Sequence, residues 1–103
     1  MAYILRILQR FHPEDRAAFL RLEQQFAAME KERPDFPRGR RSVPVTGREP
    51  TNTLIWEASF PTETAAQAAI GQMGDDDRHE ALFRQQVKYI KDAFVEIYEV
   101  LDF

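Results

Sequence analysis

One histidine and one tryptophan are the side chains of this sequence with the most informative chemistry. His79 could act as a general base or as a ligand, because imidazole titrates near neutral pH. Its place at the start of a predicted helix favours a solvent-exposed residue instead. Trp56, the single tryptophan, is expected on the helix-facing side of a strand, where it either fills the core or forms the wall of a pocket. Neither residue belongs to a motif that fixes a reaction.

Two glutamates, Glu57 and Glu96, are expected on the same face of neighbouring strands. A pair of carboxylates in such a position could perform acid–base chemistry. The preferred interpretation is ion pairing with Arg6 or Arg10, either within the chain or across a dimer.

The one cluster of basic residues in the sequence consists of four arginines (Arg38, Arg40, Arg41 and Arg48). Guanidinium groups suit phosphate, so nucleic-acid binding is one interpretation of this segment. Against it, the chain has a formal net charge of −3, and aromatic residues are scarce near these arginines. A solvated or partner-binding arm is therefore preferred, and neither nucleic acid nor a membrane is expected as a partner.

Composition narrows the class of protein. The chain has 103 residues, which suits a single domain spanning residues 1–103. It has no cysteine, which excludes disulfides and zinc–thiolate sites. No apolar run approaches the roughly 20 residues that span a bilayer, and the first residues lack the pattern of a secretory signal. We expect a cytoplasmic protein with no metal site and no cofactor.

The spacing of apolar residues predicts the elements that hold these side chains. Strands are predicted at residues 3–11, 52–60 and 93–103, where β-branched and aromatic residues alternate with others. A helix is predicted from Pro13 to just before Pro34, with an apolar stripe of Phe19, Leu22, Phe26 and Met29. A short edge strand is expected within residues 41–46, because Pro44 cannot donate a hydrogen bond to a neighbouring strand.

The second helical region is predicted to be broken at Gly74. Thr62 is the expected N-cap of its first part, and one aspartate of residues 75–77 is the expected N-cap of its second part. That second part carries an apolar face of Leu82, Phe83, Val87 and Ile90, and the last strand follows almost at once.

The predicted order of elements is that of a ferredoxin-like βαββαβ fold. We therefore expect an α+β protein with a four-stranded antiparallel sheet and its helices on one face. In a monomer the other face would expose Ile4, Leu8, Ile55, Phe94, Tyr98 and Val100 around four charged residues. Because such patches mark interaction surfaces, we expect a homodimer whose interface includes Arg6, Arg10, Ile55, Glu57, Phe94, Glu96 and Tyr98. The alternative to a dimer interface is an amphipathic, solvent-exposed face on which apolar residues are merely scattered.

The last third of the chain resembles a known family. The run His79-Glu80-Ala81-Leu82-Phe83, followed by Tyr89 and by Phe94-Val95-Glu96-Ile97-Tyr98-Glu99-Val100, is similar to NIPSNAP-like small domains. The order of elements resembles the dimeric α/β-barrel superfamily, in which two ferredoxin-like sheets pack face to face. The resemblance implies a fold rather than an activity, because such folds host unrelated functions.

Three functions stay open at this point. The resemblance favours an uncharacterised NIPSNAP-like protein that holds a small apolar ligand between helices and sheet, near Tyr3, Trp56, His79 and Tyr89. A cofactor-independent monooxygenase, an activity found in this superfamily, is the second, with His79 and Tyr98 as catalytic candidates. The third is a non-catalytic module that binds a partner through the arm of residues 38–48.

Haem-degrading members of the superfamily combine an asparagine, a tryptophan and a histidine. Trp56 and His79 are loosely similar to two of these residues, and Gln9 is the nearest amide to the missing asparagine. The tryptophan and the histidine are far apart in the chain, so haem is not expected.

Overall fold

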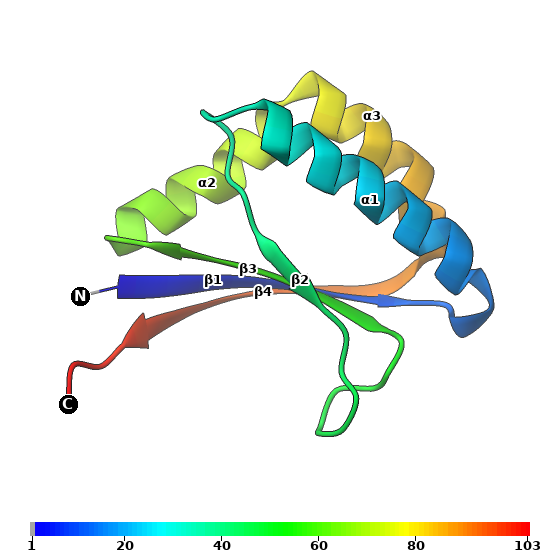
Figure 1. Ribbon diagram of the computed structural model, residues 1–103, viewed down its shortest axis with the longest axis horizontal. Helices are drawn as coiled ribbons and strands as arrows, with labels where there is room; N and C mark the ends of the chain where they lie inside the picture. The colour runs from blue at the N-terminus through cyan, green and yellow to red at the C-terminus, as the bar shows by residue number, and fades with distance from the viewer. Residues whose placement is uncertain (1) are drawn as a thin grey trace.

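Four strands and three helices make up the described part of the protein, residues 2–103 of a computed structural model (Figure 1). The strands are β1 (Ala2–Phe11), β2 (Arg40–Ser42), β3 (Thr53–Phe60) and β4 (Ile90–Val100). The helices are α1 (Arg16–Glu32), α2 (Glu63–Asp75) and α3 (Asp77–Gln86), and short 3-10 turns lie at Pro13–Asp15 and Val87–Tyr89. Among residues 2–103, no helix is both long and apolar enough to cross a lipid bilayer.

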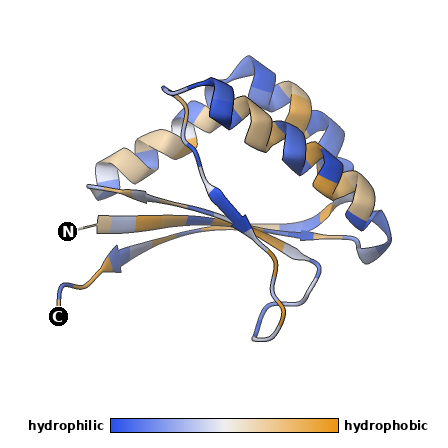
Figure 2. Ribbon diagram, viewed as in Figure 1, coloured by the Kyte–Doolittle hydropathy of each residue, from blue (hydrophilic) through white to orange (hydrophobic). Residues whose placement is uncertain are grey.

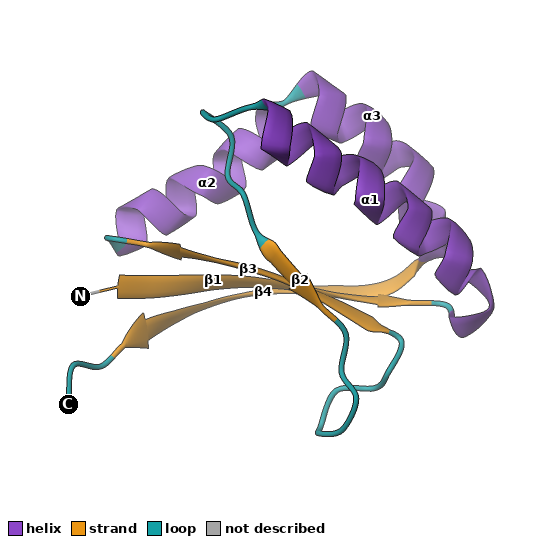
Figure 3. Ribbon diagram, in the orientation of Figure 1, coloured by secondary structure: helices purple, strands orange, loops and turns teal. Residues whose placement is uncertain are grey.

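The strands form one sheet in the order β2-β3-β1-β4, and every neighbouring pair is antiparallel. All three helices lie on one side of this sheet (Figure 3). Both observations confirm the expected α+β ferredoxin-like fold. Successive residues of each strand face opposite sides, so Ile7, paired with Trp56, lies beneath the helices, whereas Arg6, paired with Glu57, lies on the other face.

Two clusters of buried side chains fill the space between helices and sheet. The larger cluster joins Leu5 and Trp56 of the sheet to Phe26 of α1. The smaller cluster includes Phe11 and Phe19, whose rings stack at a centroid distance of 4.7 Å. The apolar stripe predicted for α1 therefore faces the sheet.

The predicted N-caps of α2 and α3 are confirmed. The side chain of Thr62 accepts a hydrogen bond from the backbone N–H of Ala65 (3.0 Å). Asp76 accepts one from the backbone N–H of His79 (2.8 Å), and Arg33 donates a second hydrogen bond to it (2.5 Å). Asp76 thus begins α3 and also attaches it to the end of α1.

The structure corrects the predicted boundaries near the end of the chain. Val87 lies in a 3-10 turn and is 46% exposed, and Ile90 belongs to β4 rather than to a helical face. Because β4 ends at Val100, the strand predicted at residues 93–103 is wrong at both ends. The cause is a contact between residues distant in sequence: the N–H of His12 donates to the carbonyl of Tyr89 (2.9 Å), which attaches the turn to the end of β1 and starts strand pairing early.

The edge strand is also shorter than predicted, since β2 covers residues 40–42 instead of 41–46. Pro44 follows closely and has no N–H with which to extend the pairing. The loop after β2 extends on the side of the sheet away from the helices (Figure 1). Arg10 of β1 holds this loop through its Nη2 atom, which donates to Oε1 of Glu49 (3.0 Å).

The sheet face opposite the helices is only partly exposed. Leu8 and Ile55 are 4% and 8% exposed, so the expectation that a monomer would leave them exposed is wrong. These two residues lie opposite each other in the sheet, and the long side chains of Arg6 and Arg10 flank Leu8 along β1. The exposed apolar residues of this face are on β4: Phe94 (43%), Tyr98 (44%) and Val100 (36%). Figure 2 shows hydrophobic and hydrophilic segments following one another along this strand.

We expect the substitution Asp76→Ala to lower the free energy of unfolding by about 1 kcal/mol at neutral pH, because α3 loses its N-cap. Hydrogen bonds from the backbone of His79 and from Arg33 lower the pKa of Asp76. A carboxylate with a lowered folded-state pKa stabilises the fold above about pH 4, and this stabilisation is lost as the pH falls through that pKa. The difference between the two proteins in urea unfolding should therefore shrink in acid.

Asp75→Ala is the matched control, because Asp75 is exposed and precedes the cap by one residue. It should change the stability by less than about 0.5 kcal/mol. Equal losses for both variants would contradict the capping role of Asp76.

Candidate functional site

A cavity of about 50 Å³ lies between the helices and the sheet, and Trp56 and His79 both line it. The other apolar walls include Phe26 and Phe83. Its polar lining is unusually rich for the interior of a small protein and consists of Gln9, Glu23, Glu30, Arg41, His79 and Gln86.

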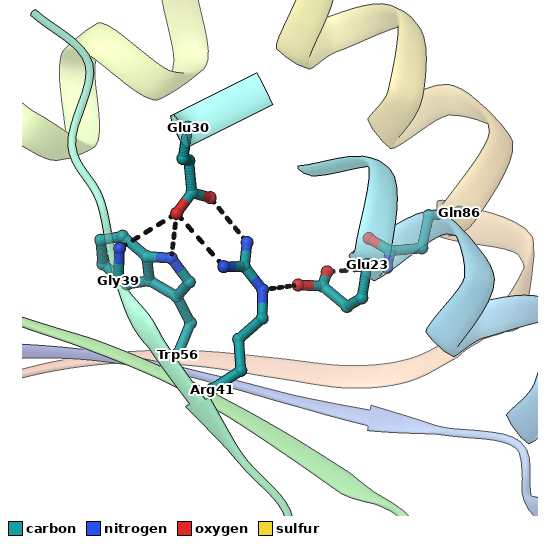
Figure 4. A network of polar contacts seen from close by, with 6 residues as sticks. All are labelled: Glu23, Glu30, Gly39, Arg41, Trp56 and Gln86. Carbon is teal, nitrogen blue, oxygen red and sulfur yellow. Dashed lines mark hydrogen bonds and ion pairs between the residues drawn. The ribbon is translucent and has the colours of Figure 1, made fainter. Parts of the chain in front are cut away.

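Glu30 is the centre of the polar contacts around this cavity (Figure 4). Its Oε1 atom accepts hydrogen bonds from the backbone N–H of Gly39 (3.0 Å) and from the indole N–H of Trp56 (3.3 Å). Arg41 donates to both of its oxygens, with Nη1–Oε1 at 3.2 Å and Nη2–Oε2 at 2.6 Å. These four contacts satisfy a carboxylate that is only 5% exposed.

Glu23 forms the second half of the network. Its Oε2 atom accepts a hydrogen bond from Nε of Arg41 (2.5 Å), and its Oε1 atom accepts one from Nε2 of Gln86 (2.8 Å). Gln86 is fully buried, and among the described residues no donor reaches its Oε1 atom. The site therefore contains one buried hydrogen-bond acceptor that the protein itself leaves unpaired.

The positions of these residues follow from the local structure. Glu23 and Glu30 are seven residues apart, which is about two helical turns, so they project from the same side of α1. Arg41 is opposite Trp56 in the sheet and therefore faces the helices. Gly39 is required just before β2, because a Cβ atom there would lie 2.0 Å from the Trp56 ring.

The arginine-rich arm is not a single solvated patch, which corrects one prediction. Arg41 points into the protein, while its neighbour Arg40 lies on the other face and donates to Glu57 (3.0 Å). Burial acts to lower the pKa of Arg41, but the hydrogen bonds and charges of Glu30 and Glu23 outweigh it, and the pKa is raised. Arg41 is therefore a permanent cation of the site.

His79 is half-buried rather than solvent-exposed, which corrects the preferred interpretation of this residue. Its ring packs against Phe26 at a centroid distance of 4.9 Å and against Phe36 at 6.0 Å. Burial lowers its pKa, and the charges of Asp76 and Glu30 oppose this only in part. At neutral pH the imidazole is neutral and retains one nitrogen that can accept a proton or a hydrogen bond.

The three tyrosines do not join this cavity. The hydroxyl of Tyr3 is 3.4 Å from Oε2 of Glu99 in an open groove beside α2. Tyr89 packs against the cluster of Phe11 and Phe19. Tyr98 lies on the opposite face of the sheet and donates to Glu96 (2.6 Å), which raises the pKa of this tyrosine. Four residues were expected around a ligand. Of these, the structure brings together Trp56 and His79 but places Tyr3 and Tyr89 elsewhere.

The ion pairs expected on the outer face form in part. Arg6 and Glu57 pair within the chain, with Nε–Oε2 at 3.4 Å. Arg10 pairs with Glu49 and with Asp92 instead of with Glu57 or Glu96. Glu57 and Glu96 therefore lie on the same face, as predicted, but are separated by β1.

The residues around the cavity do not fit haem. Gln9, Trp56 and His79 do line the same space, but its volume of about 50 Å³ is far below that of a macrocycle pocket. Within residues 2–103, no group of three or more His, Asp or Glu side chains is arranged to hold a metal ion.

We expect the substitution Arg41→Met to lower the free energy of unfolding by about 3–5 kcal/mol, because two buried carboxylates lose the one cation that pairs with them among residues 2–103. Chemical denaturation at neutral pH measures this change.

Arg40→Met is the matched control, because the side chain of Arg40 is 84% exposed and pairs with Glu57 on the surface. It should cost no more than about 1 kcal/mol. Similar losses for the two variants would show that the buried network does not hold the fold together.

Comparison with known proteins defines the fold. No protein-family model matches the chain, and no curated protein sequence matches it. A NIPSNAP family protein from Agrobacterium tumefaciens has a similar structure, with a TM-score of 0.80 and 15% identity over 100% of this chain and 96% of that chain. An uncharacterized NIPSNAP domain protein from Burkholderia xenovorans has a TM-score of 0.78, with 15% identity over 100% of this chain and 97% of that chain.

A putative antibiotic biosynthesis monooxygenase from Nitrosomonas europaea is also similar, with a TM-score of 0.71 and 11% identity over 97% of this chain and 90% of that chain. Identities this low establish a shared fold, and a fold does not by itself specify an activity. The chain therefore has the fold of NIPSNAP family proteins and of antibiotic biosynthesis monooxygenases, as its sequence led us to expect.

Proposed function

We propose that this protein binds a small molecule between its helices and its sheet, beside Trp56 and His79. One observation carries the proposal: the Oε1 atom of Gln86, a residue that lines the cavity, is buried and has no donor among the described residues. An unpaired buried acceptor costs about 1–3 kcal/mol. A ligand that donates a hydrogen bond to this atom would remove that cost.

The size of the cavity limits which part of a ligand it can hold. About 50 Å³ corresponds to one or two water molecules, given roughly 30 Å³ for each in the liquid. We therefore assign the cavity to the polar end of the ligand. In the absence of a ligand, water can occupy the same space.

A cofactor-independent monooxygenase is the second candidate function, and the neutral state of His79 favours it. A half-buried neutral imidazole in a cavity can remove a proton from a bound hydroxyl compound. Oxidation of a CH₂ group of the compound to a carbonyl, with one atom of O₂ in the carbonyl and the other leaving as water with the two hydrogens of that group, would distinguish this activity from binding alone. The arm of residues 38–48 is less suited to binding a partner, because Arg41 is used inside the protein.

Titration with small aromatic compounds of different charge tests the binding proposal. The indole N–H of Trp56 gives a unique NMR signal, because the sequence contains one tryptophan. We expect at least one compound to shift this signal in a saturable way, since the indole lines the cavity. Native mass spectrometry of the purified protein would also detect any molecule retained during purification.

A cavity-filling variant provides the control for this titration. Gln9→Phe should abolish the shift, because residue 9 lines the cavity. Gln25→Phe places the same ring at an exposed position of α1 and should leave the shift unchanged. If no compound shifts the indole signal, or if Gln9→Phe leaves the shift intact, the proposed function is wrong.

We also propose that two copies associate through the sheet face opposite the helices. Phe94, Tyr98 and Val100 on this face are more than a third exposed, and Arg6 and Glu96 lie directly opposite each other within it. A two-fold axis would cover the apolar residues and bring the charges of each copy near the opposite charges of the other. A cytoplasmic location, expected from the sequence, stays a prediction.

We expect Glu96→Lys to weaken self-association by about tenfold or more, because it places a cation beside Arg6 in the interface. Sedimentation velocity at micromolar concentration measures the change. Glu99→Lys makes the same change of charge on the helix-facing side of β4 and should have no effect. A monomeric unmodified protein, or equal effects of the two variants, would contradict this interface.

A further inference from the structure

A second hollow lies outside the cavity, between α1 and the edge strand β2. Its volume is about 300 Å³, at the lower end of the roughly 300–1,000 Å³ that is typical of small-molecule pockets. The walls are mostly apolar and include Leu20, Ala27, Val43 and Leu54. We refer to it as the α1–β2 groove.

The ion pair between Glu23 and Arg41 borders both the groove and the cavity. Both residues line both spaces, and the Nε atom of Arg41 is 2.5 Å from Oε2 of Glu23. Arg41 also keeps two hydrogen bonds to Glu30, at 3.2 and 2.6 Å. Breaking the single contact with Glu23 would therefore leave Arg41 anchored on Glu30, and we infer that this lets a ligand extend from one space into the other.

The charges of the network do not balance. Glu23 and Glu30 are two buried carboxylates, and Arg41 is the only cation within ion-pair distance of either among the described residues. One negative charge is therefore uncompensated. A buried charge without a partner is costly, so a positively charged ligand is favoured over a neutral or negative one.

The hydrogen-bonding groups of the site point to the same chemistry. The carboxylate of Glu23 and the Oε1 atom of Gln86 can only accept hydrogen bonds, and the latter has no donor. The neutral ring of His79 offers a third acceptor in the same cavity. Three acceptors around a small space match the three N–H donors of a primary ammonium group.

We propose that the ligand is a small apolar primary amine, with its apolar body in the α1–β2 groove and its ammonium group on Glu23 in the cavity. In the complex, Arg41 pairs with Glu30 and the ammonium pairs with Glu23, so each buried carboxylate has one cation. This inference rests on the proposed function, because it names the class of ligand for the same cavity.

Three probes of matched shape test the head group: 4-butylbenzylamine, 4-butylbenzyl alcohol and 4-butylbenzoate. Binding is followed through the NMR signal of the Trp56 indole N–H, which donates to Glu30 at the site. We expect the amine to bind at least about tenfold more tightly than the alcohol, and the benzoate to bind weakest. Glu23→Gln should remove the preference for the amine over the alcohol.

Two variants of α1 test the position of the apolar body. Ala27→Phe fills the groove and should weaken amine binding by about tenfold or more, whereas Ala28→Phe, at the next and exposed position, should not. Gln24→Phe narrows the groove from an exposed position and replaces Ala27→Phe if that variant fails to fold.

The outcomes separate this inference from the proposed function. If the benzoate binds as tightly as the amine, or if Glu23→Gln retains the amine preference, the amine is the wrong class. If filling the groove leaves binding intact, the apolar body lies elsewhere. In these cases the indole still shifts and the proposed function stands, whereas the absence of any shift with every probe contradicts both.

Discussion

The sharing of one buried arginine between two buried glutamates is the interaction on which the rest of this structure depends. Arg41 comes from β2, Glu23 and Glu30 from α1, and their hydrogen bonds extend to Trp56 of β3 and Gln86 of α3 (Figure 4). Four elements that are distant in sequence thus meet through polar contacts inside a small core. β2 has only three residues in the sheet, so its position depends strongly on Arg41.

A purely apolar core would be the simpler way to stabilise a chain of this size. Ion pairs that are removed from water gain little net stability, because desolvation offsets their attraction. Here the charges specify geometry: the planar guanidinium fixes the separation of α1 from β2, and the indole N–H fixes the orientation of Trp56. The same groups keep part of the interior polar, which leaves Gln86 with an unpaired acceptor. We infer that the network serves a site as well as the fold.

Most of the fold could be predicted because its signals are local. Alternation predicted the strands, and Thr62 and the aspartates after Gly74 predicted where helices begin. The end of α3 was misplaced because Ile90 suits both a helical face and a strand, and only a contact with the distant His12 decides between them. Leu8 and Ile55 could not be recognised as buried, since the flanking arginines that cover this part of the sheet also suit an exposed surface.

The site was harder to predict, because the sequence around each of its charged residues is equally consistent with a solvent-exposed side chain. Glu23 and Glu30 each follow a residue of the apolar stripe on α1, and glutamates in helices usually face water. Arg41 lies among other arginines in a segment whose composition predicts an exposed arm. A usable signal was their combination: two glutamates two turns apart beside an apolar stripe, and an arginine that alternation places on the helix-facing side of an edge strand.

The alternation of strands also connects the candidate site with the opposite face of the sheet. Arg40 and Arg41 are adjacent in β2, as are Trp56 and Glu57 in β3, and each pair divides its side chains between the two faces. The contact of Arg40 with Glu57 and that of Arg41 with Glu30 therefore lie on opposite faces of the sheet. A second copy packed on the outer face would restrain β2 and β3 through Arg40 and Glu57. It would thereby restrain the position of Arg41, which borders both the cavity and the groove.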